Sequence, residues 1–336
     1  MKAGIIGAGT WGTALAIILN RNGHEVCIWS KFEEELTALR TTHHHKNLPG
    51  AELPDNMQYS SDLQKVVQEN ELLVMAVPSI YIRSTAEEMK PYVREGKILV
   101  SVAKGIEEGT MMTMTDILED VLPQADVAVL SGPSHAEEVS RLIPTTIVTS
   151  AHSESTAKKI QDAFMQPSFR VYINADMKGI EIGAALKNVI ALAAGTADGL
   201  GYGDNTKAAL ITRGIAEIAR LGVKMGCKPE TFGGLSGIGD LIVTCASMHS
   251  RNRRAGILIG EGKSYQEAMQ EVGQIVEGVY AAKAGLELAR KYEVSMPIVE
   301  QVNAVLFENK SPREAVNELM LRDKRAESSG VAFTEA

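Results

Sequence analysis

The stretch GAGTWG at residues 7–12 decides the fold of the first half of the chain, because it fits the pattern G-x-G-x-x-G between an apolar run and a helical pattern. The first glycine of this pattern permits a tight turn, the second lets the backbone approach a pyrophosphate, and the third allows close packing of helix and sheet. N–H groups at the start of the helix then favour an anion. This position favours a dinucleotide site over a purely structural glycine-rich turn. The predicted contacts are Gly7, Gly9, Thr10, Trp11 and Gly12.

The end of the second predicted strand, residues 25–29, is expected to set the choice of cofactor. A site for NAD alone usually has Asp or Glu there to bind the ribose 2′-hydroxyl. Here Ser30 and Lys31 follow the strand, and the first acid is Glu33. Because a hydroxyl and a cation suit a 2′-phosphate, we predict that NADPH (NADP) is used, with NADH (NAD) as a second cofactor. The alternative is that Lys31 is a solvated loop lysine.

The two halves of the chain carry different patterns. Apolar runs typical of strands occur at residues 2–6, 25–29, 71–77, 97–102, 126–130 and 145–149. They alternate with helical patterns such as residues 11–22, 32–42, 82–92 and 111–121, which favours a parallel sheet covered on both faces. Long helical segments then take over at residues 179–195, 205–222, 253–261, 264–271, 279–292 and 296–308. We predict an α/β domain with a Rossmann-type, doubly wound sheet over residues 1–177 and a mostly α-helical domain over residues 178–336.

The composition is that of an acidic globular protein. Among 336 residues, 34 are Lys or Arg and 42 are Asp or Glu, and the net charge of −8 argues against nucleic acids as partners. Cys27, Cys227 and Cys245 form no CxxC pair, which suits a reducing cytoplasm. Glycines interrupt the apolar stretch that ends at Leu19, which argues against a signal peptide. No uncharged apolar run reaches the ~20 residues needed to cross a bilayer, so we expect a cytoplasmic protein without membrane insertion.

A series of motifs extends from Gly7 to about Pro297. The first half contains GAGTWGTALA (7–16), AVPS (76–79), AKGIE (103–107) and GPSHAEEV (132–139). The second half contains GAALKNVIALAAG (183–195), GDNTKAALITRG (203–214), GIGDLIVTC (237–245), SRNRRAG (250–256) and VEGVYAA (276–282). Together and in this order they resemble the bacterial-type NAD(P)-dependent glycerol-3-phosphate dehydrogenases. The resemblance implies reduction of dihydroxyacetone phosphate to sn-glycerol 3-phosphate for phospholipid biosynthesis, and a C-terminal domain like that of 6-phosphogluconate dehydrogenase.

Lys187 lies in an apolar helical segment, flanked by Ala184, Leu186, Val189 and Ile190. A lysine in such a place can snorkel to water. A buried amine instead has a depressed pKa, which lets it exchange a proton near neutral pH. The resemblance favours the second interpretation, because it makes the matching lysine the catalytic proton donor and acceptor. Lys187 would protonate the C2 oxygen of the ketone during reduction and remove the hydroxyl proton in the reverse direction.

The resemblance also implies a substrate site built from both halves. Lys104 follows a strand end, where ligands gather in open α/β sheets. Arg251 presents a fork of donors that matches phosphate oxygens, although the arginines near it could form only a basic helix face. Asp240 would either orient the substrate hydroxyls or hold Lys187 in place. The implied substrate contacts are Lys104, Gly132, Ser134, Lys187, Asp240, Ser250, Arg251 and Asn252.

Further cofactor contacts follow from the resemblance alone. Besides the glycine-rich turn and Lys31, they are Lys104, Ala136, Arg251, Ile275 and Glu277. His135 departs from the aromatic residue expected at its position, and we interpret it as a packing substitution rather than a catalytic group. The nicotinamide would perform the redox chemistry, so the resemblance implies no metal.

Some residues that invite a functional interpretation are explained more simply. The run His43–His45 has no acidic or cysteine partner at ligand spacing, and consecutive histidines point in different directions on a helix. We therefore predict no metal site there. Asp176, Asp204 and Asn205 are interpreted as helix-capping residues, because short polar side chains accept free N–H groups.

Two other classes of protein remain open at this point. A β-hydroxyacid or ketopantoate-type reductase shares the glycine motif, but it is not expected to share GDLIVTC and SRNRRAG. A non-catalytic NAD(P)-binding sensor would have little reason to keep Lys187, Asp240 and Arg251 together. An enzyme is therefore favoured, and a homodimer is the commonest default for its assembly.

Overall fold

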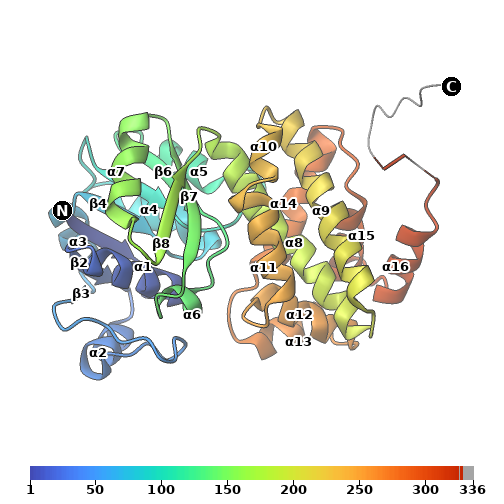
Figure 1. The fold of residues 1–336 in the computed structure, drawn as a ribbon, viewed down its shortest axis with the longest axis horizontal. Helices are drawn as coiled ribbons and strands as arrows, with labels where there is room; N and C mark the ends of the chain where they lie inside the picture. The colour runs from blue at the N-terminus through green and yellow to red at the C-terminus, as the bar shows by residue number, and fades with distance from the viewer. Residues whose placement is uncertain (325, 328–336) are drawn as a thin grey trace.

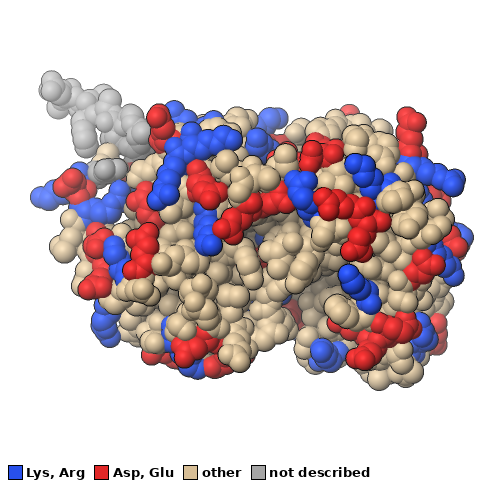
Figure 2. Space-filling model, turned by 180° about the vertical axis from the view of Figure 1, so that it is seen from behind, with Lys and Arg blue, Asp and Glu red and all other residues tan. Residues whose placement is uncertain are grey.

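The computed structural model describes residues 1–324 and 326–327. A sheet-containing half and a helical half lie side by side, joined where the sheet ends and helix α8 begins (Figure 1). Several small and polar residues after about Lys324 predict that the tail frays, but these residues lie almost entirely outside the described part. Lysines and arginines are interspersed with acidic residues on the face in Figure 2, with no broad cationic patch on that face.

The sheet has eight strands in the order β3-β2-β1-β4-β5-β6-β7-β8. They are β1 (Lys2–Ile6), β2 (Glu25–Trp29), β3 (Gln58–Ser60), β4 (Leu72–Met75), β5 (Ile98–Ser101), β6 (Asp126–Ser131), β7 (Thr145–Ala151) and β8 (Phe169–Ile173). The six predicted strands are confirmed, and β1 lies inside the sheet. The two edge strands were missed: β3 has only three residues, and β8 leaves Arg170, Tyr172 and Ile173 exposed, so neither forms an apolar run.

The expected all-parallel arrangement is wrong at one edge of the sheet. The strands from β3 to β6 pair in parallel, but β7 pairs antiparallel with β6, and β8 then runs parallel to β7. The first six strands have the order of the doubly wound dinucleotide-binding fold. Only the short helix α6 (Ala136–Val139) separates β6 from β7, whereas a parallel return requires a longer crossover.

Helices cover both faces of the sheet. They are α1 (Thr10–Arg21), α2 (Glu33–Thr42), α3 (Leu63–Glu69), α4 (Ile82–Met89), α5 (Met114–Val121) and α7 (Glu154–Phe164). In β4, Leu72 and Val74 face the core shared with α1, α2 and α7. Leu73 and Met75 face the core shared with α3, α4 and α5. Since successive strand residues point to opposite faces, a strand covered on both sides must be apolar throughout, as this one is.

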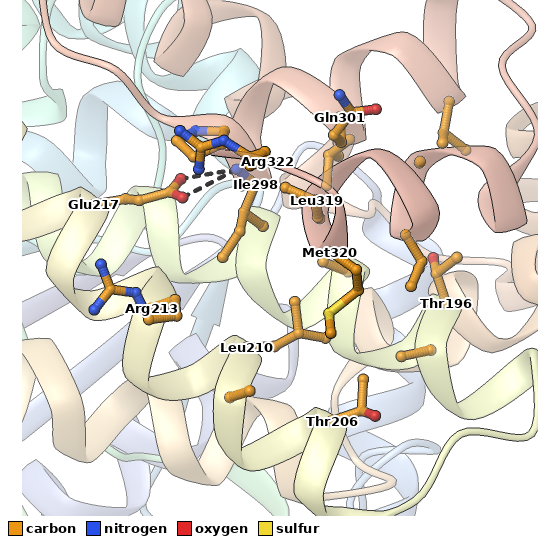
Figure 3. A pocket seen from close by; sticks show the side chains of 18 of the residues that line it. Thr196, Thr206, Leu210, Arg213, Glu217, Ile298, Gln301, Leu319, Met320 and Arg322 are labelled. Atoms are coloured by element: carbon orange, nitrogen blue, oxygen red, sulfur yellow. Dashed lines mark hydrogen bonds between the residues drawn. The ribbon is translucent and has the colours of Figure 1, made fainter. Parts of the chain in front are cut away.

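The described part of the second half contains helices joined by loops, and no strand. Its helices are α8 (Met177–Gly199), α9 (Asp204–Lys224), α10 (Pro229–Phe232), α11 (Asp240–Ala246), α12 (Arg251–Gly260), α13 (Tyr265–Val272), α14 (Glu277–Lys291), α15 (Pro297–Phe307) and α16 (Pro312–Met320). The six predicted helices are confirmed. A cavity of about 560 Å³ lies among α8, α9, α15 and α16 (Figure 3).

Helix α8 is the central element of this half. By length and composition it could cross a bilayer, but 89% of its most apolar window is buried within the protein, as in a core helix. The Asp176 side chain caps it by accepting from the Gly179 N–H at 3.0 Å, as predicted. The capping roles of Asp204 and Asn205 are wrong. Gly203 is the N-cap of α9 and makes no side-chain bond, so Asp204 lies within the first turn.

Candidate active site

The glycine-rich turn between β1 and α1 leaves room for a nucleotide phosphate. Gly7 has φ +122°, and a Cβ on Gly12 would lie 2.2 Å from the Gly7 carbonyl oxygen, so neither position accepts a side chain. A Cβ on Gly9 would meet nothing within 4 Å. The backbone is therefore open to a ligand at the second glycine, as a pyrophosphate-binding turn requires.

The other residues of the turn also fit a bound dinucleotide. Gly9 is the N-cap of α1 and makes no side-chain cap bond, and the first turn of the helix holds no acidic residue, so its N–H groups suit an anion. Thr10 is half-buried beside them. The indole Nε1 of Trp11 is buried without a hydrogen-bond partner among the described residues. Buried donors are normally satisfied, so this atom suits a ligand acceptor.

Two alanine substitutions separate the roles of the glycines. Gly12→Ala is expected to destabilise the fold by more than 1 kcal/mol, because its Cβ collides with the backbone of the turn. Gly9→Ala is expected to leave the urea midpoint unchanged but to weaken NADPH binding about tenfold or more, since its Cβ occupies the open space. Urea unfolding and fluorescence titration measure the two effects. Normal NADPH affinity in Gly9→Ala would contradict the assignment of the site.

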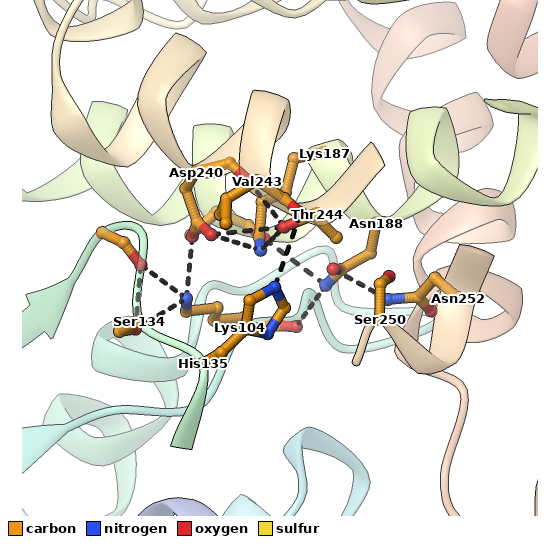
Figure 4. A network of polar contacts seen from close by, with 12 residues as sticks. Lys104, Ser134, His135, Lys187, Asn188, Asp240, Val243, Thr244, Ser250 and Asn252 are labelled. Atoms are coloured by element: carbon orange, nitrogen blue, oxygen red, sulfur yellow. Dashed lines mark hydrogen bonds and ion pairs between the residues drawn. The ribbon is translucent and has the colours of Figure 1, made fainter. Parts of the chain in front are cut away.

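A buried carboxylate joins two lysines across the two halves of the protein (Figure 4). Asp240, at the start of α11, accepts from Lys187 of α8 at 2.6 Å and from Lys104, after β5, at 2.7 Å. Lys104 also donates to the Gly132 carbonyl at 3.0 Å and lies 3.5 Å from the Ser134 Oγ. The predicted residues from strand ends and helices therefore meet in one network. Of the two roles left open for Asp240, the geometry matches the one that holds Lys187 in place.

Burial sets the proton affinity of this network. Lys187 is 5% exposed, and burial lowers the pKa of its ammonium to about 8, helped by Lys104 and opposed by Asp240. Burial alone would raise the pKa of the Asp240 carboxyl, but Lys104 and Lys187 outweigh it and hold that pKa below its usual value. Lys187 can therefore exchange a proton near neutral pH while Asp240 stays ionised.

Two residues of this network were missed in the sequence. The Thr244 Oγ1 accepts from Lys187 at 2.6 Å and donates to the Asp240 carbonyl oxygen at 2.5 Å. The Asn188 amide accepts from Asn252 at 2.9 Å and lies 3.4 Å from the Lys104 carbonyl oxygen. Thr244 follows Asp240 by four residues, so helical spacing alone could have placed both on one face.

The candidate phosphate cradle, formed by Ser250, Arg251 and Asn252, lies where α12 crosses α8 closely. A Cβ on Gly195 would lie 2.1 Å from the Arg253 carbonyl oxygen, so this glycine lets the two backbones approach. Ser250 caps α12 by accepting from the Arg253 N–H at 3.2 Å. Asn252 accepts from the Gly278 N–H at 2.8 Å, which ties the cradle to α14. Ser250 and Asn252 are thus engaged within the protein.

Arg251 and Glu277 lie close together, as their predicted roles require. Burial lowers the pKa of Arg251, opposed by the charges of Glu277 and Glu137. Glu277 begins α14 and accepts from the N–H and the hydroxyl of Ser79, in the turn after β4. Burial raises the pKa of the Glu277 carboxyl, and these bonds and Arg251 oppose that rise. The pair lies between the nucleotide-binding half and the helical half.

The predicted 2′-phosphate contacts are only partly available. Lys31 is exposed, with its Nζ 3.8 Å from Glu88. Ser30 is 4% exposed, and its hydroxyl donates to the Glu35 carboxylate at 2.8 Å and accepts from the Phe32 N–H. Glu35 lies in the first turn of α2, so the fold brings an acid back to the strand end, where the sequence has Ser30 and Lys31.

The remaining predicted residues have simpler surroundings. Ala136 is buried at the start of α6, and Ile275 is partly buried in the loop before α14. The ring of His135 packs against His249 with centroids 5.7 Å apart, and burial lowers the His135 pKa. His43 adopts a left-handed conformation at the end of α2, and the described residues contain no group of three metal-ligating side chains.

A turn suited to an anion and a buried lysine whose pKa is lowered toward neutrality are typical of nicotinamide-dependent dehydrogenases, and fold and site place the chain in this class. Models of the NAD-dependent glycerol-3-phosphate dehydrogenase N-terminus and C-terminus match residues 2–157 and 176–317. The chain belongs to this family, and it is an NAD(P)-dependent dehydrogenase.

Individual relatives match along almost the whole chain. The glycerol-3-phosphate dehydrogenase (NAD(P)+) of Agathobacter rectalis is 59% identical over 333 residues, covering 99% of each chain. That of Fusobacterium nucleatum is 58% identical over 330 residues, covering 97% of this chain and 98% of the relative. The solved glycerol-3-phosphate dehydrogenase of Coxiella burnetii has a TM-score of 0.92 at 36% identity, covering 96% of this chain and 99% of that one.

Proposed function

We propose that the protein reduces dihydroxyacetone phosphate to sn-glycerol 3-phosphate with NADPH or NADH, reversibly. The observation that carries the proposal is the pairing of buried Lys187 with Asp240 directly across from the strand-end residues of the nucleotide-binding half. Family membership supports the choice of substrate, since the relatives are named for glycerol 3-phosphate.

Lys187 acts as the proton donor in this proposal. A lysine ammonium has three N–H donors, of which Asp240 and Thr244 accept two, and we assign the third to the C2 oxygen of the ketone. When bound, the nicotinamide would supply the hydride to C2. Asp240 and Thr244 hold Lys187 in place, and Lys104 binds the other carboxylate oxygen of Asp240. The neutral amine left after reduction recovers its proton from solvent. In the reverse direction that amine accepts the hydroxyl proton.

The first experiment measures nicotinamide oxidation with dihydroxyacetone phosphate, in parallel with NADPH and NADH. Rapid oxidation that depends on the phosphorylated ketone supports the proposal. No oxidation with either cofactor, in folded protein that binds NADPH, would overturn it and would favour a related reductase or a sensor. Ketopantoate in the same assay, and β-hydroxyacids with the oxidised cofactors in the reverse assay, distinguish a related reductase from a sensor.

Arg251→Ala is expected to raise the KM for dihydroxyacetone phosphate by about tenfold or more, because a charge-assisted phosphate contact is lost. The loss should shrink with unphosphorylated dihydroxyacetone, which has no group for the guanidinium to bind. Arg254→Ala, on the same helix, is the matched control and is expected to change neither KM. Equal losses with both ketones would contradict a phosphate contact.

Lys31→Ala is expected to raise the KM for NADPH about tenfold and to leave the KM for NADH unchanged, because only NADPH carries the 2′-phosphate. Lys90→Ala, another exposed lysine of the same domain, provides the control. Initial rates at varied cofactor concentration measure the effect. If wild-type protein strongly prefers NADH, the Glu35 carboxylate beside Ser30 outweighs Lys31, and the predicted NADPH use is wrong.

The wider proposal rests on family membership and on the composition. We assign residues 1–177 to dinucleotide binding and residues 178–336 to substrate binding and catalysis. The enzyme would be a cytoplasmic homodimer without membrane insertion or nucleic-acid partners. Its product would supply phospholipid biosynthesis. Sedimentation of the purified protein tests the predicted homodimer, and fractionation of the cells that make it tests the predicted location.

A further inference from the structure

The cavity among α8, α9, α15 and α16, shown in Figure 3, is lined by none of the residues of the candidate active site. Its volume of about 560 Å³ is in the range of small-molecule sites, which are mostly apolar with a few placed polar groups. Nothing in the proposed reaction uses it. We propose that this cavity binds an amphipathic anion: an unbranched alkyl chain with a carboxylate head group.

The walls of the cavity suit an alkyl chain. They include Leu192, Ile259, Leu306 and Ala315, which are between 2% and 6% exposed. Residues buried so deeply lie at the bottom of the cavity, where a flexible chain can reach and a flat protein surface cannot. An empty apolar space of this size leaves its lining without partner atoms, so filling it with methylene groups is favourable.

One side of the cavity suits an anionic head group. Arg213 and Arg322 are exposed there, and Figure 3 shows them on the side opposite Thr196. Arg220 adds a third guanidinium to the lining, against the carboxylates of Glu217 and Glu327. Positive charge is therefore in excess.

The Glu217 carboxylate is bound at the start of α15, although its charge also interacts with Arg220. Both of its oxygens lie 3.0 Å from the Ile298 N–H at the start of α15, where they cap the helix. Arg213 donates to the Glu327 carbonyl oxygen at 3.2 Å, which uses one of its five N–H donors. The remaining fork matches a carboxylate.

The test is calorimetric titration of the full-length protein with octanoate, decanoate and dodecanoate below their micelle concentrations. Each added methylene group should tighten binding about fourfold if the chain enters the cavity. Dodecyltrimethylammonium, with the same chain and a cationic head, should bind at least about tenfold more weakly than dodecanoate. Equal binding of the two amphiphiles would overturn the assignment of an anion site.

Variants locate the binding site. Val316→Trp places an indole in the cavity and should weaken dodecanoate binding at least about tenfold, while Asn317→Trp, on the exposed side of α16, should leave it unchanged. Arg213→Glu should weaken binding at least about tenfold, and Arg313→Glu, outside the cavity, should not. Circular dichroism and unchanged ketone reduction verify that each variant is folded.

Two other occupants are outcomes of the same experiment. If wild-type protein binds no dodecanoate but a chain ending at Glu327 does, residues 328–336 occupy the cavity and the proposal is wrong. If dodecanoate binds only at protein concentrations where the protein is monomeric, a second copy covers the cavity in the dimer. That result also overturns the proposal. Both results are independent of the proposed reductase activity, which is assayed separately.

Discussion

Lys187→Ala is expected to lower kcat for dihydroxyacetone phosphate reduction about a hundredfold or more, because the transition state loses its proton donor. The KM should change little, since the phosphate contact is assigned to Arg251. Lys178→Ala, an exposed lysine on the same helix, is the matched control and should retain full activity. Near-normal turnover in Lys187→Ala would remove the lysine from the chemistry.

The pH dependence of the wild-type enzyme tests the same assignment without a mutation. Reduction needs the ammonium form of Lys187, so its rate should fall as the pH rises through about 8, the pKa of this group. Oxidation of glycerol 3-phosphate needs the neutral amine, so its rate should rise through the same pH. Parallel pH profiles in both directions would mean that another group transfers the proton.

Asp240→Asn is expected to have a large effect on both stability and activity. Removing the charge leaves buried Lys187 and half-buried Lys104 without their shared carboxylate, and breaking a buried ion pair in this way costs about 3–5 kcal/mol. Since Asp240 raises the pKa of Lys187 against burial, its loss should move the pH midpoint of reduction below about 8. Urea unfolding and the pH–rate profile measure the two effects.

Asp198→Asn is the matched control for this substitution. Asp198 also pairs with two cations, Arg253 at 2.8 Å and Lys207 at 2.9 Å, but it lies outside the lysine network. We expect a smaller loss of stability, because this carboxylate is more exposed, and an unchanged pH midpoint. A midpoint that stays near 8 in Asp240→Asn would show that Asp240 does not tune Lys187.

The predictions that hold are those with a local physical cause. The glycine-rich turn could be predicted because each of its glycines meets a steric requirement of the turn, of the elements beside it or of the ligand's approach. The six inner strands could be predicted from the sequence because burial on both faces requires apolar residues throughout each strand. The edge strands β3 and β8 lack this requirement and were missed. The antiparallel strand β7 was misassigned, because strand direction depends on how the chain returns to the sheet rather than on its residues.

Within the site, the sequence by itself determined the nucleotide-binding turn and, through the family resemblance, a candidate set of lysines and phosphate contacts. Only the tertiary structure decided how these groups act on one another. Asp240 lies 136 residues from Lys104 and 53 from Lys187, yet it joins both. Glu35 reaches Ser30 only because α2 folds back onto the strand end. The depressed pKa of Lys187 also belongs to the folded protein, because it arises from the exclusion of water by packed helices, which no linear pattern contains.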